Sequence, residues 1–178
     1  MKFVMCIICC CCLQAFGQKY QLVNEASKCH FEIKNFGINT GGDIGGINGF
    51  INLNPQLLGY ATVNVTLQVA TIDTDNKARD QHLKKEDYFD VANYPTMQLV
   101  STQILATTQP HHYILKGNLT IKNKTVAVEF PFVVTQKNDG IFLTGGFTIN
   151  RQTFGVGGSS AVLSNKVKIS INAFAKAL

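Results

Sequence analysis

The chain has 178 residues and a formal net charge of +5, from 16 lysine and arginine residues against 11 aspartate and glutamate residues. That length suits one domain that buries a substantial hydrophobic core. The basic residues are scattered and form no run of five like charges, so the sequence gives little support to a nucleic-acid-binding function.

The first 17 residues have the organisation of a secretion signal. Lys2 precedes an apolar run from Phe3 to Leu13, and Ala15-Phe16-Gly17 offers small residues where a signal peptidase reads them. The run is shorter than the roughly 20 residues of a membrane-spanning helix. We therefore expect a signal peptide at residues 1–17, cleaved after Gly17, and a periplasmic or secreted mature domain at residues 18–178.

Cysteine placement bears on both anchoring and disulfides. Five of the six cysteines lie within the expected signal, and none follows the small residue that lipoprotein processing prefers, so lipid anchoring is the less favoured alternative. Cys29 is then left without an intramolecular partner. We expect it to be a small buried apolar residue.

From Cys29 onward, apolar and polar residues alternate. One apolar and one polar face per strand is typical of an antiparallel sheet that is wetted on one side. Turn residues separate the rows at Gly41-Gly42, Asn54-Pro55, Gln109-Pro110, Lys122-Asn123, Asn138-Asp139-Gly140 and Gly157-Gly158. We expect about eight strands that close into an all-β antiparallel barrel, because closure removes exposed sheet edges. The interior of such a barrel either fills with side chains or holds one small ligand. The glycine-rich segments are compatible with either interior, because glycines occur both at barrel corners and beside cavities.

The alternation stops between Asp73 and Ser101, where charged residues surround Tyr88 and Phe89. A compact polar insert in an all-β chain is typically the place where a barrel is capped or opened. We expect a short helical insert around residues 76–92.

Ordered motifs in this insert and beyond it resemble one family. They are Arg79-Asp80-Gln81-His82-Leu83-Lys84, Asp87-Tyr88-Phe89-Asp90 and Tyr94-Pro95, followed by Gly117-Asn118-Leu119-Thr120-Ile121-Lys122 and Ile149-Asn150-Arg151 with Phe154-Gly155. The chain resembles the YceI-like family of secreted bacterial lipocalin-like proteins, which bind polyisoprenoids and related long-chain lipids.

The resemblance implies an extended eight-stranded lipocalin-like barrel with an apolar tunnel. Its ligand would be a polyisoprenoid, an isoprenoid quinone or a fatty-acid derivative, with no catalytic cofactor, no metal and a possible homodimer. The expected tunnel wall is Phe31, Ile33, Val63, Val65, Leu67, Phe89, Leu119, Val128, Phe130, Phe132, Phe147 and Phe154, and the expected polar mouth is Arg79, His82 and Arg151.

The sequence departs from the family pattern in two places. Ile44 and Ile47 stand where the family commonly has aromatic residues, which would widen the cavity. The first hairpin reads Asn35-Phe36-Gly37-Ile38, without a histidine or a second charge, so the preferred ligand head group stays open.

The polar candidates each have a structural alternative. Arg151 shares strand parity with Phe147 and Ile149, which directs it inward, where a buried cation needs an anion. We favour an ion pair with Asp80, Asp87 or Asp90 over a ligand head group. Arg79 and His82 either line the mouth or hold the insert on the barrel rim.

Two classes of function remain, with a filled barrel that serves only as an interaction module as a weaker third. The favoured class is a lipid-binding carrier and not an enzyme. The alternative is an enzyme acting on a long-chain isoprenoid or lipid with His82 as acid or base beside Asp80 or Asp87, which would need an oriented pair within hydrogen-bond reach.

Overall fold

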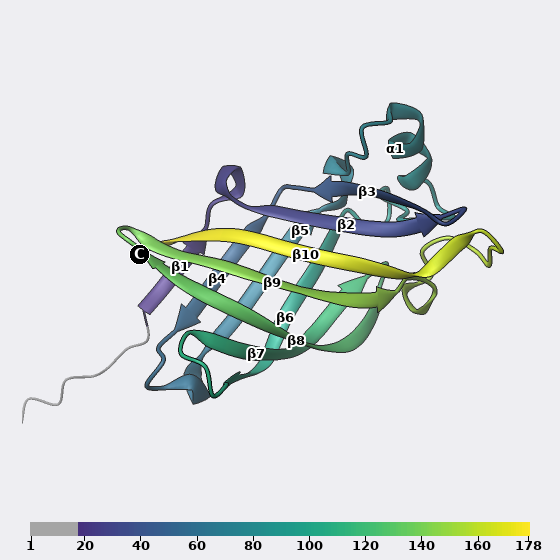
Figure 1. Cartoon of the computed structure of the whole chain (residues 1–178). Coiled ribbons are helices and arrows are strands. Elements are labelled where there is room, and N and C mark those ends of the chain that lie inside the picture. Colours follow the sequence, from purple (N-terminus) through teal and green to yellow (C-terminus); the bar gives the residue numbers. More distant parts are fainter. Residues whose placement is uncertain (1–17) are drawn as a thin grey trace, which may run out of the picture.

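The computed structural model describes residues 18–178, in which ten strand segments form one antiparallel sheet (Figure 1). The segments are β1 (Gln18–Leu22), β2 (Lys28–Asn35), β3 (Ile38–Ile44), β4 (Asn48–Leu53), β5 (Thr62–Gln68), β6 (Thr96–Ala106), β7 (His112–Ile121), β8 (Lys124–Lys137), β9 (Gly140–Asn150) and β10 (Leu163–Ala177). The expected signal peptide, its cleavage after Gly17 and any lipid anchor lie outside the described residues.

The sheet closes because the long strand β10 pairs with β9 on one side and with both β1 and β2 on the other. β1 and β2 are two halves of one strand, separated by a 3-10 helix at Asn24–Ala26. β3 and β4 are likewise halves of the next strand, since β3 pairs with β2 and β4 pairs with β1. The barrel therefore has eight strand positions, which confirms the expected closed antiparallel architecture.

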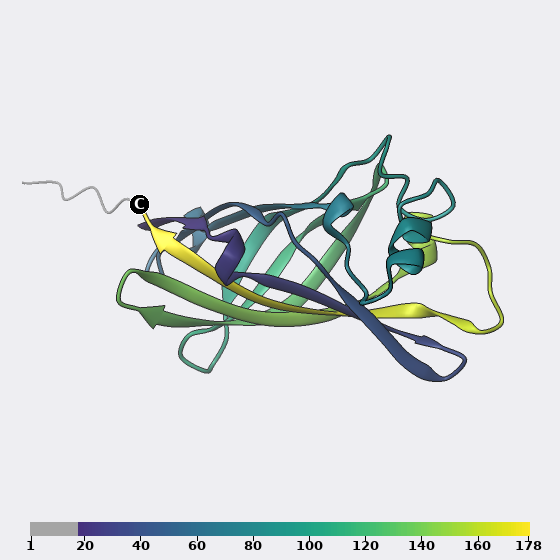
Figure 2. The ribbon, with the colours of Figure 1, turned by 90° about the horizontal axis from the view of Figure 1, so that it is seen from above.

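At the β1–β4 end the barrel wall is continuous, but at the β2–β3 end it is not. There β3 meets the chain after β5 through one isolated bridge, between Asp43 and Asp73. The β2–β3 hairpin extends past this point and projects from the barrel (Figure 2). This end of the barrel is therefore the more open one.

The segment between β5 and β6 contains the one α-helix of residues 18–178, α1 (Lys77–Leu83). Asn76 caps it, because its side-chain oxygen accepts a hydrogen bond of 3.0 Å from the Arg79 amide. Turns follow as far as Asn93. This matches the expected short insert around residues 76–92, and Figure 2 places it at the end from which the β2–β3 hairpin projects. No helix in the described part of the chain has the length and apolar character needed to cross a membrane.

Alternation puts the apolar rows inside the barrel, where Ile51, Ile141 and Ala175 are almost fully buried. The predicted turn at Lys122-Asn123 is present, with φ of 49° and 61°, the left-handed pair that a two-residue hairpin requires.

The prediction of a turn at Gly41-Gly42 is wrong, because both residues lie within β3. A Cβ atom on Gly42 would lie 2.5 Å from the Asp73 carbonyl oxygen, and one on Gly41 would lie 2.5 Å from the Phe31 carbonyl oxygen. These glycines allow a close approach of neighbouring backbones and do not form a turn.

Candidate ligand-binding cavity

Two cavities lie inside the barrel. The outer chamber, of about 500 Å³, lies between the β2–β3 hairpin, the insert and residues 156–163. The inner chamber, of about 140 Å³, lies deeper among the strands. Ile121, Ile149 and Ile169 line both, so the two chambers adjoin.

The inner chamber has no charged residue in its wall. Seven of the expected wall residues line it, namely Val63, Val65, Leu67, Leu119, Phe130, Phe132 and Phe147. The rings of Phe130 and Phe147 stack with centroids 4.4 Å apart, which fixes the shape of this part of the wall.

The outer chamber takes its wall from several elements. Phe31 and Ile33 come from β2, Phe89 comes from the insert, and Phe154 comes from a 3-10 helix at Arg151–Phe154. Polar residues are also present in its wall, among them Thr74, Ser159 and Ser160. An apolar chain with a polar end would therefore fit with its end in the outer chamber.

Val128 is the one expected wall residue that lines neither chamber, although it packs against the core. It lies opposite Gly117 in the β7–β8 pair. Other wall residues were absent from the expected set: Leu22, Cys29, Ile44, Ile47, Ile51, Met97, Leu99, Leu115, Ile121, Leu143, Ile149, Ile169, Ile171 and Ala173. Most of them lie on the same inward rows, so strand parity is the signal that would have found them.

Arg151 is directed inward and is only 3% exposed, but the expected ion pair with Asp80, Asp87 or Asp90 is wrong. Its Nε donates to the Ser164 carbonyl oxygen at 2.9 Å, and Nη1 donates at 2.9 Å to the carbonyl oxygens of both Val156 and Gly158. Nη2 donates to the Leu163 carbonyl oxygen at 3.4 Å. The guanidinium group thus organises the backbone of residues 156–164, and within residues 18–178 it has no carboxylate partner.

Arg79 lines the outer chamber, but its hydrogen bonds hold the start of the insert. Its Nε donates to Thr74 Oγ1 at 2.8 Å, and Nη2 donates to the Thr74 carbonyl oxygen. Asp80 Oδ1 accepts from both the amide and the hydroxyl group of Thr74, at 2.9 and 2.6 Å. Thr74 and Asp80 are both buried, so this network fastens α1 to the chain that leaves β5.

His82 is exposed at the mouth of the outer chamber and contacts Tyr88 edge to face, with ring centroids 4.8 Å apart. Across residues 18–178 its ring has no hydrogen bond or ion pair to Asp80 or Asp87. The pair that an acid–base mechanism would use is therefore not assembled in this conformation.

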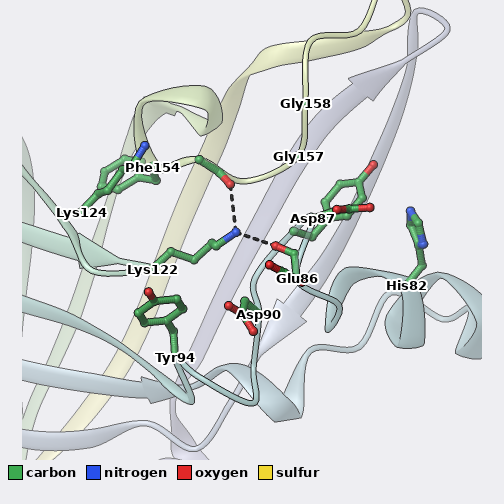
Figure 3. Close-up of a pocket in the computed structure, with 12 residues that line it drawn as sticks. His82, Glu86, Asp87, Asp90, Tyr94, Lys122, Lys124, Phe154, Gly157 and Gly158 are labelled. Carbon is green, nitrogen blue, oxygen red and sulfur yellow. Dashed lines mark hydrogen bonds between the residues drawn. The ribbon is translucent and has the colours of Figure 1, made fainter.

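A third pocket, the rim pocket, lies outside the barrel where the insert meets the β7–β8 turn and residues 155–158 (Figure 3). Lys122 Nζ donates to the carbonyl oxygens of Glu86 at 2.7 Å and Gly155 at 3.2 Å. The Gly157 amide donates to the Asp87 carbonyl oxygen at 2.8 Å. Lys122 thus fastens the insert to the loop that carries the Arg151 contacts.

The pKa of the Cys29 thiol in the inner chamber is raised from 9.0 to about 11, first by burial and then by the nearby Asp43 carboxylate. Asp43 itself accepts from Lys28 Nζ at 2.9 Å and contacts His30 Nδ1 at 2.7 Å.

Within residues 18–178 no group of three His, Cys, Asp or Glu side chains is placed to hold a metal ion.

A family model described as the YceI-like domain matches residues 20–175. The chain belongs to the YceI-like family. Curated relatives include UPF0312 proteins of Photorhabdus laumondii, 30% identical over 48% of this chain and 56% of that protein, and of Staphylococcus aureus, 29% identical over 62% of this chain and 66% of that protein. The chain thus spans little more than half the length of the first of these relatives.

Solved structures agree on the fold. BcnA of Burkholderia cenocepacia superposes with a TM-score of 0.81 at 24% identity, over 86% of this chain and 98% of that one. A polyisoprenoid-binding domain from Saccharophagus degradans superposes with a TM-score of 0.73 at 14% identity, over 89% and 98%. At identities of 24% and 14%, the similarity shows that the barrel fold is shared.

Proposed function

We propose that this YceI-like protein is a carrier that holds one long-chain apolar ligand in the two adjoining chambers. A polyisoprenoid, an isoprenoid quinone and a fatty-acid derivative all have the required shape. The observation that carries the proposal is the wall that the chambers share at Ile121, Ile149 and Ile169. An elongated apolar space fits a chain better than a compact ligand.

The size of the space supports this ligand class. The outer chamber, at about 500 Å³, lies within the roughly 300–1,000 Å³ that small-molecule sites occupy. Burial of an apolar chain contributes about 0.8 kcal/mol per methylene group before ordering costs. Affinity would therefore grow with the length of the chain that enters the inner chamber.

Arg151 supports a polar or anionic head group in the outer chamber. In the described part of the chain its buried positive charge is compensated by backbone carbonyl dipoles, and an anion beside it would lower the cost of that burial. Arg151 is also among the residues that line the outer chamber. The polyisoprenoid-binding name of the Saccharophagus domain agrees with this choice of ligand.

The test is native and extraction mass spectrometry of the purified protein. We expect one apolar molecule per chain, released by organic solvent and replaced when a long-chain quinone or fatty acid is added. A protein that carries no such molecule and takes up none of these additions would contradict the carrier proposal.

We propose no catalytic role, since His82 contacts the Tyr88 ring and, among residues 18–178, has no carboxylate partner. His82→Ala is expected to leave ligand retention intact. Measurable turnover of a bound lipid that His82→Ala abolishes would favour the enzyme alternative instead.

We also propose that the carrier acts in the periplasm or outside the cell. The support is the signal-like organisation of residues 1–17. Intact mass measurement of the exported protein tests it, with a new N-terminus at Gln18 as the expected result.

A further inference from the structure

The β2–β3 hairpin ends in two large exposed apolar side chains. Phe36 is 72% exposed and Ile38 is 70% exposed, and Val162 of the neighbouring loop is 41% exposed. The loop and the hairpin are joined, because the Phe36 amide donates to the Val162 carbonyl oxygen at 3.0 Å. We name Phe36, Ile38 and Val162 the apolar tip; the hairpin and this loop project from the same end of the barrel in Figures 1 and 2.

Phe36 does not serve the turn in which it lies. Its φ is +50° and that of Gly37 is +77°, so both central residues of the turn are left-handed. Asn, Asp and Gly are favoured there, and an aromatic residue at positive φ is disfavoured. A strained, exposed Phe adds nothing to the barrel core, which points to a role outside the fold.

The apolar tip stands at the mouth of the outer chamber. Asn35, which precedes Phe36, and Val162 both line that chamber. Ile38 lies on the same strand face as Thr40, another residue of the chamber wall. The apolar surface of the tip is therefore next to the entrance that a ligand would use.

Lysines flank the apolar tip and outnumber the carboxylates around them. Lys34 is exposed on β2, and Lys166 and Lys168 are exposed on the adjacent β10. Residues 33–42 and 152–168 contain no Asp or Glu. Glu32, opposite Lys168 in the β2–β10 pair, is the carboxylate next to these lysines. The carboxylates of the insert, among them Glu86 and Asp87, line the rim pocket instead. An apolar tip with basic flanks matches a membrane surface that carries anionic lipids.

We propose that the apolar tip inserts into the headgroup layer of an anionic phospholipid bilayer while Lys34, Lys166 and Lys168 contact phosphate groups. The mouth of the outer chamber would then face the bilayer. Under the proposed carrier function, an apolar ligand would pass between the bilayer and the chamber without crossing water. A second copy of the chain is the less favoured occupant. A stable dimer needs roughly 1,200–2,000 Å² of buried surface, and a hairpin tip offers only a few side chains.

Vesicle flotation tests the proposal with solvent-extracted, refolded protein, so that the result does not depend on a bound ligand. The vesicles are phosphatidylcholine alone or phosphatidylcholine with phosphatidylglycerol. We expect binding to the anionic vesicles that weakens as salt is raised. Phe36→Asn should reduce this binding about tenfold or more, and its thermal unfolding should not fall below that of the parent, because Asn-Gly suits the turn.

Matched controls lie at the opposite end of the barrel. Tyr60 is 75% exposed, and Tyr60→Asn should leave vesicle binding unchanged. Each of Lys34→Gln, Lys166→Gln and Lys168→Gln should weaken binding to anionic vesicles by roughly fivefold. Lys137→Gln and Lys176→Gln, on strands that pair near Gly140, should not.

Absence of binding to anionic vesicles at low salt would overturn the proposal, as would equal binding by the parent and Phe36→Asn. A dimer in light scattering that Phe36→Asn converts to a monomer, without vesicle binding by the parent, would assign the tip to self-association. Mass spectrometry tests ligand binding independently of vesicle flotation. Failure of the carrier proposal and failure of membrane docking are therefore distinguishable.

Discussion

Arg151 Nη1 donates a hydrogen bond of 2.9 Å to the carbonyl oxygen of Gly158. This contact fixes the loop that closes one side of the outer chamber around a buried cation. The space beside it is small: a Cβ atom on Gly157 would lie 2.9 Å from Arg151 Nη1 and 2.9 Å from Tyr88 Cε1. The backbone of Gly157 is also left-handed, with a φ of +68°.

Gly157→Ala should therefore destabilise the protein by about 1–3 kcal/mol, since strain and the displaced guanidinium group add together. Urea unfolding measures the change. Gly158→Ala is the matched control, because a Cβ atom there meets nothing within 4 Å, and it should be nearly neutral. Equal losses in the two variants would show that the Arg151 contacts do not confine this loop.

Arg151→Lys should destabilise the protein by about 2–3 kcal/mol, although it keeps the charge. An ammonium group has three donors at one point and cannot reach the four spread carbonyl groups that the guanidinium group serves. Thermal unfolding gives the loss. Unchanged stability in Arg151→Lys would mean that positive charge alone, and not the fork of donors, holds the loop.

How much of this site was predictable from the sequence depends on the residue. Alternation predicted the inward direction of Phe130, because strand parity is a local property. Arg151 is buried as expected, but it lies one residue past β9 in a 3-10 helix, where strand parity no longer applies. The partners of Arg151 were not predictable, since backbone carbonyl groups of a loop have no side-chain signature. Gly42 was misread as a turn because a glycine that permits close backbone approach has the same local pattern. The position of Ile169 between the outer and inner chambers depends on the register between strands of the barrel. The alternation pattern of a single strand does not define that register.

Stability should fall above about pH 9 because of Cys29. The pKa of its thiol is raised to about 11 in the fold, by burial first, whereas the unfolded chain ionises near its ordinary pKa. The native state then holds a proton that the unfolded state loses, so stability is full below about pH 9 and decreases as pH rises towards 11. The loss reaches about 2–3 kcal/mol.

Cys29→Ala isolates this contribution, because every other titrating group is common to both proteins. Denaturant unfolding at several pH values between 7 and 11 should show a constant difference below about pH 9 and a shrinking one above it. Parallel curves for the two proteins would contradict burial of the thiol in the inner chamber.

Lys122→Met should loosen the insert without unfolding the barrel. The variant loses the two hydrogen bonds from Nζ to Glu86 and Gly155, each worth about 1.5–3 kcal/mol as a bond from a charged donor. Amide hydrogen exchange in residues 84–94 should accelerate, and bound ligand should leave about tenfold faster. Lys124→Met, in the same pocket but without these bonds, should change neither rate.

Ile169→Phe should weaken the binding of long ligands and leave the binding of short ligands unchanged. Ile169 lines both chambers together with Ile121 and Ile149, so a larger side chain there narrows their junction while the outer chamber keeps its volume. A long polyisoprenoid or quinone should lose affinity by at least tenfold, whereas a short-chain analogue that fits the outer chamber should bind as before. Val100→Phe, on the outward face of β6, is the matched control, and unfolding curves verify that both variants fold. Equal loss of short and long ligands would show that the two chambers are not occupied by one extended chain.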